Sequence, residues 1–228
     1  MVRGMFNDIA PTYDRLNHIL SFDIDKLWRR RVVRIVGKLG AKYIMDMATG
    51  TGDLAIALAR NIDGSKIYGA DFSSEMLAVA EKKIATLALS ERISLTECNA
   101  ENIPLADEAV DCATVAFGVR NFEHQREALT EMKRTIKRGG YLIVLEFSNP
   151  RFALVRWCYR LYSHYILPAI GRLVSKHATA YTYLPESIDE FASPKAFSQL
   201  LEEVGFERVE RKSQSFGIAH IYIAHKAQ

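Results

Sequence analysis

The chain has 228 residues, of which 49% are hydrophobic and 25% are charged, a composition that is ordinary for a globular protein. Its formal net charge of +3 is too small to argue for nucleic-acid binding, and no apolar run approaches the roughly 18 residues of a membrane span. No secretory signal peptide is expected. The length predicts a single domain, residues 1–228, with a substantial core.

The three cysteines lie far apart in the sequence. They show neither the spacing of a metal site nor that of a redox pair, so no metal site is predicted. Two of them, Cys98 and Cys112, fall in strand-like runs and are expected to be small core residues, whereas Cys158 lies in a later segment. Such cysteine usage fits a reducing compartment, and a cytoplasmic location is expected.

Residues 1–40 are expected to form an N-terminal helical cap. Residues 5–20 would make a poor isolated helix, whereas residues 23–39 have a helical period. An apolar face is marked by Leu27, Val32, Ile35, Val36 and Leu39. The other positions carry cations, at Lys26, Arg29, Arg30, Arg31 and Arg34. These cations indicate either a solvated face or attraction to an anionic membrane surface or substrate.

A ligand-binding unit is predicted over residues 43–60. Tyr43–Met47 has the pattern of a buried strand, Thr49–Gly52 that of a tight turn, and Asp53–Arg60 that of a helix. Glycines let the backbone approach a bound molecule closely, and a helix start offers unpaired N–H groups. About 20 residues on, after the next strand, Asp71 is placed to accept both ribose hydroxyls. The pattern therefore predicts a nucleoside-containing cofactor.

Two alternatives stand beside that prediction. A strand, glycine turn and helix can also be joined for packing alone, without any ligand. The run Gly50-x-Gly52-x-x-Ala55 also satisfies a loose form of the nicotinamide-dinucleotide fingerprint, which permits alanine at its third position.

Strands and helices then alternate. Strands are predicted at 66–70, 93–98, 110–117 and 141–147, and helices at 74–87, capped by Ser73 or Ser74, and at 123–137, stopped by Gly139 and Gly140. This alternation predicts an α/β fold with a doubly wound parallel sheet, whose ligands lie beyond the carboxyl ends of the strands. Five loops are expected to converge there: Asp46–Gly52, Asp71, Asn99-Ala100, Phe117–Asn121 and Glu146–Ser148.

Residues 149–192 break the alternation and are expected to form a helical insertion on the substrate side. No acidic residue occurs from Ser148 to Pro185, and arginines alternate there with aromatic residues. This pattern indicates either a helical cap packed on the core or a lid over a large apolar substrate, in contact with a membrane. RNA binding is disfavoured, because no RNA-binding motif is present.

The C-terminal part is predicted to contain a helix opened by Ser193-Pro194 and an antiparallel pair of strands, 209–216 and 218–226. Tyr222-x-x-x-Lys226 superficially resembles the catalytic pair of short-chain dehydrogenases. The residues around it alternate with the period of a strand, however, and on a strand Tyr222 and Lys226 would be about 13 Å apart. S-adenosyl-L-methionine explains more than a nicotinamide. Its amino-acid end suits Gly50–Gly52, its ribose suits Asp71, and its adenine suits Phe72 and Asn99-Ala100.

Five blocks of sequence resemble those of the ubiquinone/menaquinone biosynthesis C-methyltransferase family. They are Tyr13-Asp14-x-x-Asn17-x-x-Leu20-Ser21 with Trp28, Asp46–Leu54, Phe117–Asn121, Lys137-x-Gly139-Gly140 with Leu145–Ser148, and Tyr183–Ser187, the last most like the menaquinone branch. Ala116 departs from the pattern, because many members have a cofactor-contacting serine there.

The resemblance implies a class I S-adenosyl-L-methionine-dependent methyltransferase with a Rossmann-like, mostly parallel seven-stranded sheet. The implied cofactor contacts are Thr51, Asp71, Asn99 and Ala100, and Tyr13 either closes over the cofactor or packs as an ordinary core residue. The implied reaction methylates a ring carbon of a reduced polyprenyl quinone, most closely demethylmenaquinol. Such a lipid substrate implies peripheral contact with the inner face of the membrane.

Arg120 and Asn121 are the predicted catalytic residues. Arg120 is expected to stabilise the substrate phenolate or to orient a water, because an arginine stays protonated and is a poor base. Asn121 would hold the other substrate oxygen. A structural ion pair at a strand end is the alternative for Arg120. Alternative functions are methylation of another apolar phenol or of 2-polyprenyl-6-methoxybenzoquinol, and non-catalytic carriage of a quinone.

Overall fold

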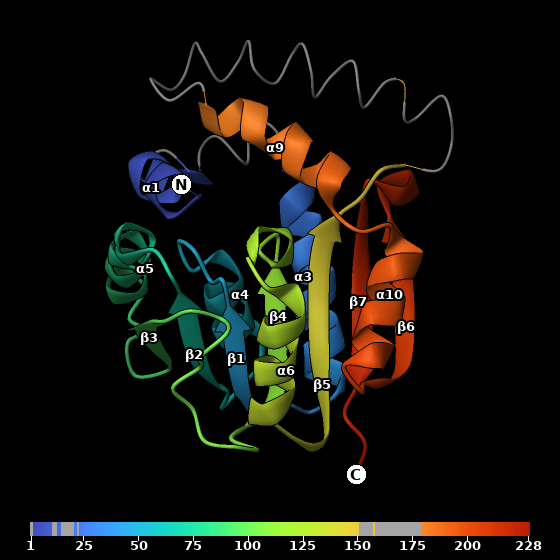
Figure 1. Ribbon diagram of the computed structural model, residues 1–228. Coiled ribbons are helices and arrows are strands. Elements are labelled where there is room, and N and C mark those ends of the chain that lie inside the picture. Colours follow the sequence, from blue (N-terminus) through green and yellow to red (C-terminus); the bar gives the residue numbers. More distant parts are fainter. Residues whose placement is uncertain (1, 11–12, 15–20, 22, 151–156, 158–178) are drawn as a thin grey trace.

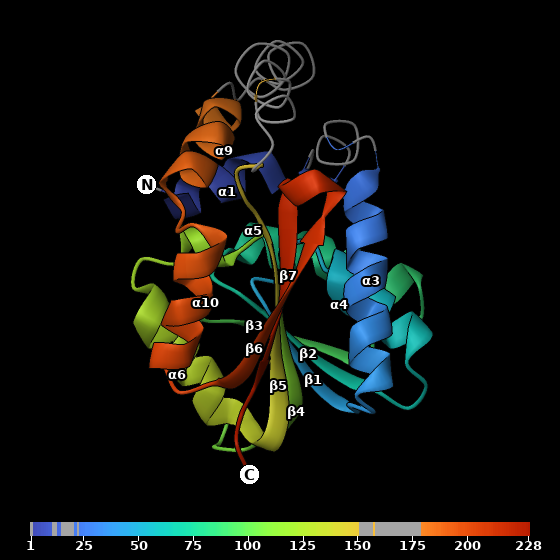
Figure 2. The same ribbon diagram turned by 90° about the vertical axis from the view of Figure 1, so that its right-hand side faces the viewer.

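A computed structural model of the chain describes residues 2–10, 13–14, 21, 23–150, 157 and 179–228. This part of the chain forms one seven-stranded sheet between two layers of helices (Figures 1 and 2). The strand order is β3-β2-β1-β4-β5-β7-β6. In chain order the strands are β1 (Tyr43–Met47), β2 (Lys66–Asp71), β3 (Ile93–Glu97), β4 (Val110–Ala116), β5 (Ile136–Phe147), β6 (Glu207–Gln214) and β7 (Ala219–His225).

The sheet is parallel from β3 to β5 and antiparallel at β7 and β6. The central strands are buried on both faces: the neighbours Met45 and Ala113 of β1 and β4 lie in the core on one face, and the preceding pair, Ile44 and Cys112, lies in the core on the other. Strands covered on both sides need continuous apolar runs, which explains why these segments do not alternate between polar and apolar residues. The predicted mostly parallel sheet with an antiparallel C-terminal pair is confirmed.

Helices cover both faces and the carboxyl edge of the sheet. On one face lie α3 (Ile24–Lys38), α4 (Asp53–Asn61) and α5 (Ser74–Thr86); on the other lie α6 (Gln125–Thr135) and α10 (Pro194–Glu203). Above the carboxyl ends lie α1 (Val2–Ile9) and α9 (Thr179–Glu190) (Figure 1). None of the described helices is both long enough and apolar enough to cross a membrane.

Two of the predicted helix caps are present. Ser73 Oγ accepts a hydrogen bond from the Met76 backbone N at 3.2 Å, and Ser193 Oγ accepts one from the Ala196 backbone N at 3.3 Å. Each serine satisfies one of the N–H groups that a helix start leaves without an intrahelical partner. The short polar side chains before α5 and α10 therefore determine where these helices begin.

The predicted end of the 123–137 helix is wrong. α6 ends at Thr135, and Gly139 and Gly140 lie inside β5. The pairing of β5 with β4 is irregular between Ile136 and Tyr141, so the two glycines serve a distorted strand start. A Cβ on Gly140 would lie 2.6 Å from the Asp111 carbonyl oxygen, which explains why this position requires glycine.

The predicted faces of α3 need correction. Leu27 was assigned to the buried face but is 46% exposed. Arg29 and Arg31 were included in a solvated face but are partly buried, and Arg29 pairs with the buried Asp25 one turn before it. A fully buried carboxylate in a helix requires a cation, and the i,i+4 spacing supplies it.

Several predictions fall outside the described residues. These are Asn17 and Leu20 of the first signature block, Cys158, and most of the 149–192 insertion, namely residues 151–156 and 158–178. Within the insertion, α9 is a helix that contains Pro185. Cys112 is buried in β4 and Cys98 is half-buried just after β3, as expected for small packing residues.

Candidate active site

The loop after β1 forms the floor of the candidate site. Ala48, Gly50 and Gly52 have positive φ angles of 54°, 56° and 83°, a region that favours glycine and is uncommon for alanine. The Thr49 backbone N donates to the Ala70 carbonyl oxygen at 3.0 Å, which fastens the loop to β2. A Cβ on Gly50 would meet no atom within 4 Å, so the loop faces open space there.

Asp46, at the end of β1, holds this loop from below. Its two carboxylate oxygens accept hydrogen bonds from Thr49 Oγ1 and Thr114 Oγ1, each at 2.7 Å. Asp46 is 1% exposed, and burial raises its pKa to about 6. The two hydroxyls and the charge of Arg29 oppose that shift.

Asp71, at the end of β2, holds the loop from the side. It accepts hydrogen bonds from the Gly50 backbone N at 2.8 Å and from the Ser73 backbone N at 3.0 Å. Burial raises the pKa of Asp71, and these N–H donors lower it. The predicted ribose acceptor is therefore also a support of the glycine turn.

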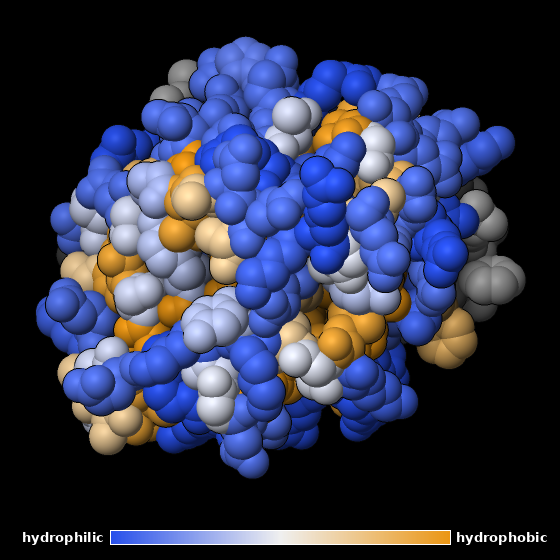
Figure 3. Space-filling view, turned by 90° about the horizontal axis from the view of Figure 1, so that it is seen from below, coloured by the Kyte–Doolittle hydropathy of each residue, from blue (hydrophilic) through white to orange (hydrophobic). Residues whose placement is uncertain are grey.

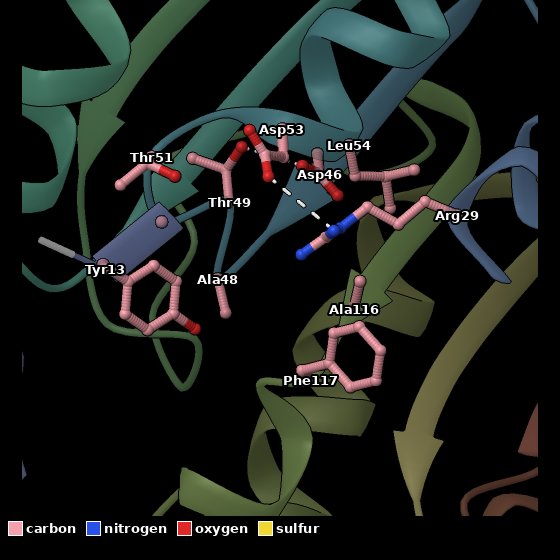
Figure 4. Close-up of a pocket in the computed structure, with 11 residues that line it drawn as sticks. Tyr13, Arg29, Asp46, Ala48, Thr49, Thr51, Asp53, Leu54, Ala116 and Phe117 are labelled. Atoms are coloured by element: carbon pink, nitrogen blue, oxygen red, sulfur yellow. Dashed lines mark hydrogen bonds and ion pairs between the residues drawn. The ribbon is translucent and has the colours of Figure 1, made fainter. Parts of the chain in front are cut away.

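A hollow of about 360 Å³, partly open to solvent, lies above this loop (Figure 4). Arg29 reaches into it from α3, with its guanidinium 3.7 Å from an oxygen of Asp53 (Figure 4). Tyr13 lies across the hollow from Arg29. The lining residues are Tyr13, Arg29, Asp46, Ala48, Thr49, Gly50, Thr51, Asp53, Leu54, Ala116 and Phe117.

Three of the predicted cofactor residues, Tyr13, Gly50 and Thr51, line this hollow. Gly52 does not line it and instead precedes α4, where a Cβ would lie 3.2 Å from that of Ala80. Asp71 does not line it either, but it holds the backbone of Gly50. The last two predicted contacts, Asn99 and Ala100, follow β3. Asn99 is exposed, and its Oδ1 accepts from the Glu101 backbone N at 3.1 Å, whereas Ala100 is buried.

The N-terminal cap is attached directly to the site. Thr51 Oγ1 donates to a carboxylate oxygen of Asp14. Lys83 of α5 joins Asp14 at 2.7 Å and Asp53 at 2.6 Å. Among the described residues of the cap, Tyr13 and Arg29 line the hollow, and Asp14 links the cap to the loop after β1.

Arg29 is the lining residue that sequence reasoning missed. The sequence pattern of α3 does not indicate that Arg29 faces the site, because cations on a helix are usually solvated. The available signal was Asp25, which lies one turn earlier on the same side of α3 and has to be paired if it is buried. Only the packing of α3 against α4 and β5 brings the guanidinium into the hollow.

A second group of polar residues lies at the ends of β4 and β5, beneath α9. Arg120 Nη1 lies 2.7 Å from Glu146 Oε1, with the two side chains only 6% and 0% exposed. Arg120 also donates to the Phe117 carbonyl oxygen at 2.6 Å and to Ser187 Oγ at 3.2 Å. The ion pair considered as the alternative for Arg120 is therefore present, and its partner is Glu146.

Asn121 and His220 belong to the same region. Tyr183 of α9 donates its hydroxyl to Asn121 Oδ1 at 2.9 Å. His220 of β7 is paired in register with Glu146, and its Nδ1 lies 2.7 Å from Ser148 Oγ. Because that hydroxyl already donates its proton to the Gly217 carbonyl oxygen at 2.8 Å, Nδ1 of His220 is the donor. The tautomer of this histidine is thus determined by Ser148.

The two groups of residues meet where the loop after β4 passes the loop after β1. A Cβ on Gly118 would lie 2.4 Å from the Cβ of Ala48, so this close approach requires glycine. Phe117, with a positive φ of 60°, stacks on Phe147 with ring centroids 4.5 Å apart. Arg29 lies over the Phe117 ring and Arg120 over the Phe147 ring, each at 5.5 Å.

Comparison with known proteins identifies the family. The family model described as "ubiE/COQ5 methyltransferase family" matches residues 1–226. The chain belongs to this family. It is 42% identical over 226 residues to the ubiquinone/menaquinone biosynthesis C-methyltransferase UbiE of Geobacter sulfurreducens, with 99% of this chain and 88% of the relative covered. It is 39% identical over 225 residues to demethylmenaquinone methyltransferase of Bacteroides fragilis, with coverage of 99% and 92%.

The fold agrees with membership of this family. The crystal structure of a SAM-dependent methyltransferase from Aquifex aeolicus superposes with a TM-score of 0.62 at 20% sequence identity, covering 84% of this chain and 87% of that one. The predicted class I methyltransferase fold is confirmed. The chain is a methyltransferase whose cofactor is S-adenosyl-L-methionine.

The residues around the hollow fit that cofactor. The open space over Gly50 admits a group against the backbone, and Arg29 offers a cation to the carboxylate of the methionine part. The carboxylate of Asp71 lies directly beside the glycine turn, at the end of the adjacent strand. Ala116 also lines the hollow.

Proposed function

We propose that this protein methylates a ring carbon of a reduced polyprenyl quinone, and that its substrate is demethylmenaquinol. The observation that carries the proposal is the arrangement of Arg120, Asn121 and the Phe117–Phe147 stack beside the cofactor hollow. An aromatic surface next to fixed polar groups suits an apolar ring that carries two oxygens. The names of the curated relatives support the same substrate class.

The chain's own residues have to favour and hold the phenolate form of the quinol. When bound, S-adenosyl-L-methionine supplies an electrophilic methyl group on a sulfonium. The ring carbon beside an ionised hydroxyl is nucleophilic, so stabilising negative charge on that oxygen promotes attack. Arg120 is already oriented by Glu146, Ser187 and the Phe117 carbonyl, so its guanidinium needs little rearrangement to act.

Asn121 is proposed to hold the second quinol oxygen. Because the Tyr183 hydroxyl donates to Asn121 Oδ1, the amide is oriented with Nδ2 as its remaining donor. A ring held by its oxygens at two points presents one carbon to the methyl donor, which is the positioning that methyl transfer requires. Tyr13 is proposed to close the opposite side of the cofactor hollow.

The decisive experiment is a methyl-transfer assay with a labelled methyl donor and a short-tailed demethylmenaquinone, reduced in one arm and oxidised in the other. We expect product from the reduced form alone, because only the quinol has an ionisable hydroxyl. Another apolar phenol and 2-polyprenyl-6-methoxybenzoquinol are assayed in parallel. Product from one of these, with none from demethylmenaquinol, would contradict the proposed substrate. Absence of cofactor binding in calorimetry would instead support a quinone carrier.

The proposed role of Asp71 in binding the cofactor is tested by the variant Asp71→Ala. The change removes charge-assisted hydrogen bonds worth about 1.5–3 kcal/mol each, so cofactor affinity is expected to fall at least tenfold. Isothermal titration calorimetry measures the effect. Asp63→Ala is the matched control, because Asp63 is exposed and lies between α4 and β2, away from the hollow. Equal affinity in Asp71→Ala and in the control would remove Asp71 from the cofactor site.

A further inference from the structure

Exposed apolar side chains gather at one place on the carboxyl edge of the molecule. Phe216, in the turn between β6 and β7, is 75% exposed, and Ile24 and Leu27 of α3 are 39% and 46% exposed. The two elements touch, because Trp28 Nε1 donates to Ser215 Oγ at 3.0 Å. Leu27 directly precedes Trp28 in the sequence, and Phe216 directly follows Ser215. Figure 2 shows the turn beside the upper end of α3.

The α3 side of this patch forms one stripe. Ile24, Leu27 and Arg31 are spaced i, i+3 and i+7, which places them on one face of the helix. Arg31 Nη1 donates to Gln214 Oε1, at the end of β6. The stripe therefore runs from the start of the helix to the β6–β7 turn, so the three apolar residues belong to one surface.

The backbone of the turn holds Phe216 outward. Ser215, Phe216 and Gly217 have successive positive φ angles of 44°, 59° and 94°. A bulky aromatic residue at positive φ is an outlier that the surrounding structure has to maintain, and such outliers concentrate at functional sites. Neither packing nor local conformation explains a phenylalanine here, because its ring is mostly exposed.

The surroundings of the patch are basic. Cations flank it at Lys26, Arg30, Arg31, Arg34 and Lys212. The nearby carboxylates are already paired, Asp23 with Lys26 at 2.7 Å and Glu210 with Lys212 at 3.6 Å. Within the part of the chain that the structure describes, Arg30 and Arg34 enter no ion pair. Exposed apolar side chains beside cations that lack an ion pair, here Arg30 and Arg34, complement an anionic lipid surface.

The opposite end of the molecule differs. Figure 3 views the end at which the parallel strands begin, where hydrophilic residues cover most of the face and apolar ones lie between them. The exposed aromatic residue at that end of β1 is Tyr43, and Lys137 lies 5.0 Å from its ring centroid. Tyr43 therefore provides an internal comparison for Phe216.

We propose that Ile24, Leu27 and Phe216, here called the docking face, insert into the surface of an anionic lipid bilayer. The proposal rests on the proposed function, because a polyprenyl tail keeps the substrate in a bilayer. The docking face is joined to the substrate side of the site. Ser148, directly after β5, donates its backbone N to the Ile218 carbonyl oxygen at 2.9 Å and its hydroxyl to that of Gly217.

The test measures vesicle binding and methyl transfer in the same proteins. Vesicles of phosphatidylcholine alone and of phosphatidylcholine with phosphatidylglycerol are sedimented with the full chain. We expect binding to the anionic vesicles that weakens as salt is added. Phe216→Asn and Leu27→Gln are each expected to lower the partition coefficient about tenfold. Asparagine tolerates positive φ and glutamine is a good helix former, so neither change strains the fold.

Two variants serve as controls. Tyr43→Ser removes an aromatic ring of similar exposure from the opposite end, and vesicle binding is expected to stay unchanged. Phe216→Trp keeps an aromatic ring that suits a membrane interface, and it is expected to retain binding. Arg30→Gln with Arg34→Gln is expected to reduce binding to the anionic vesicles by about tenfold while leaving binding to neutral ones unchanged.

Methyl-transfer assays with a soluble and with a vesicle-bound substrate distinguish a failure of this proposal from a failure of the proposed function. Phe216→Asn is expected to methylate a water-soluble, short-tailed demethylmenaquinol normally and a long-tailed one in vesicles at least tenfold more slowly. Wild-type activity on the soluble substrate with equal vesicle binding by wild type and Phe216→Asn would overturn the docking face alone. A wild type that ignores vesicles but dimerises through Phe216 would also overturn it, by assigning the face to a contact between copies. Inactivity on every quinol would overturn the proposed function instead.

Discussion

In the cofactor half of the site, the buried carboxylate of Asp71 holds backbone N–H groups, whereas in the substrate half the buried carboxylate of Glu146 also holds a charged side chain. Asp71 accepts from the backbone N–H groups of Gly50 and Ser73. Glu146 accepts from the Phe147 backbone N at 2.9 Å and also holds the guanidinium of Arg120, which is 26 positions away in the chain. A backbone-held loop depends on chain conformation, so its shape survives most side-chain changes. A side chain held by one buried charge depends on that charge, so it is sensitive to a single truncation.

The largest expected effect comes from breaking the ion pair of the substrate half. Arg120→Ala leaves the Glu146 carboxylate buried without its cation, which is expected to lower the free energy of unfolding by about 3–5 kcal/mol. Urea unfolding at pH 7 measures this loss. Arg126→Ala is the matched control, because its pair with Glu203 is about half exposed on both sides and is worth about 0–1 kcal/mol.

A double variant separates the structural role of Arg120 from its proposed catalytic role. Arg120→Met with Glu146→Leu removes both charges, and most of the lost stability is expected to return. Methyl transfer should remain lost if Arg120 acts on the substrate. Recovery of turnover together with stability would show that Arg120 serves the fold alone.

The next largest loss of stability is expected at the contact between the loop after β1, in the cofactor half, and the loop after β4, in the substrate half. Gly118→Ala places a methyl group 2.4 Å from the Cβ of Ala48, and overpacking of this kind is expected to cost about 1–3 kcal/mol. Adding Ala48→Gly moves the methyl group from one loop to the other and should restore stability, because position 48 has a positive φ that glycine tolerates. Gly37→Ala, in the last turn of α3 with only an ordinary contact nearby, is expected to be neutral or stabilising. Thermal unfolding of the four proteins tests the contact, and a double variant no better than Gly118→Ala would refute it.

A smaller effect is expected from Asp46, whose pKa is raised to about 6 by burial. Between the unfolded and folded pKa values the native state binds more protons, so this group's contribution to stability is present at low pH and is lost as pH rises through about 6. The loss between pH 5 and pH 7 is on the order of 1 kcal/mol. Asp46→Asn lacks this titration, so wild type should gain stability relative to the variant as pH falls from 7 to 5. A difference between the two proteins that is independent of pH would contradict the raised pKa.

The smallest effect is expected at the wall between the N-terminal cap and the cofactor loop. Lys83 joins Asp14 and Asp53, and all three side chains are between 24% and 29% exposed. Lys83→Met is therefore expected to cost no more than about 1 kcal/mol, and less at high salt. Urea unfolding at low and high salt measures both values. A loss above about 2 kcal/mol that salt leaves unchanged would show that this network behaves as a buried one.

The comparison also explains which parts of the site could be predicted. Gly50, Thr51 and Asp71 belong to one strand–loop–helix unit and its neighbouring strand, so local pattern and spacing were enough to place them at one end of the sheet. Arg120 was assigned to the converging loops for the same reason. Its partners Glu146 and Ser187 lie 26 and 67 positions away and carry no local signal that names them.

Alone, the sequence determined the alternation of strands and helices, the antiparallel C-terminal pair and the glycine turn, because periodicity, caps and turn residues act over a few positions. It also carried the motifs by which the family is identified. Only the tertiary structure decided that Arg29 enters the hollow, that Gly139 and Gly140 belong to a strand, and that Trp28 of α3 bonds to Ser215 in the β6–β7 turn. These outcomes depend on which distant segments pack together, and a side chain's burial is settled only when its neighbours from the rest of the chain are in place.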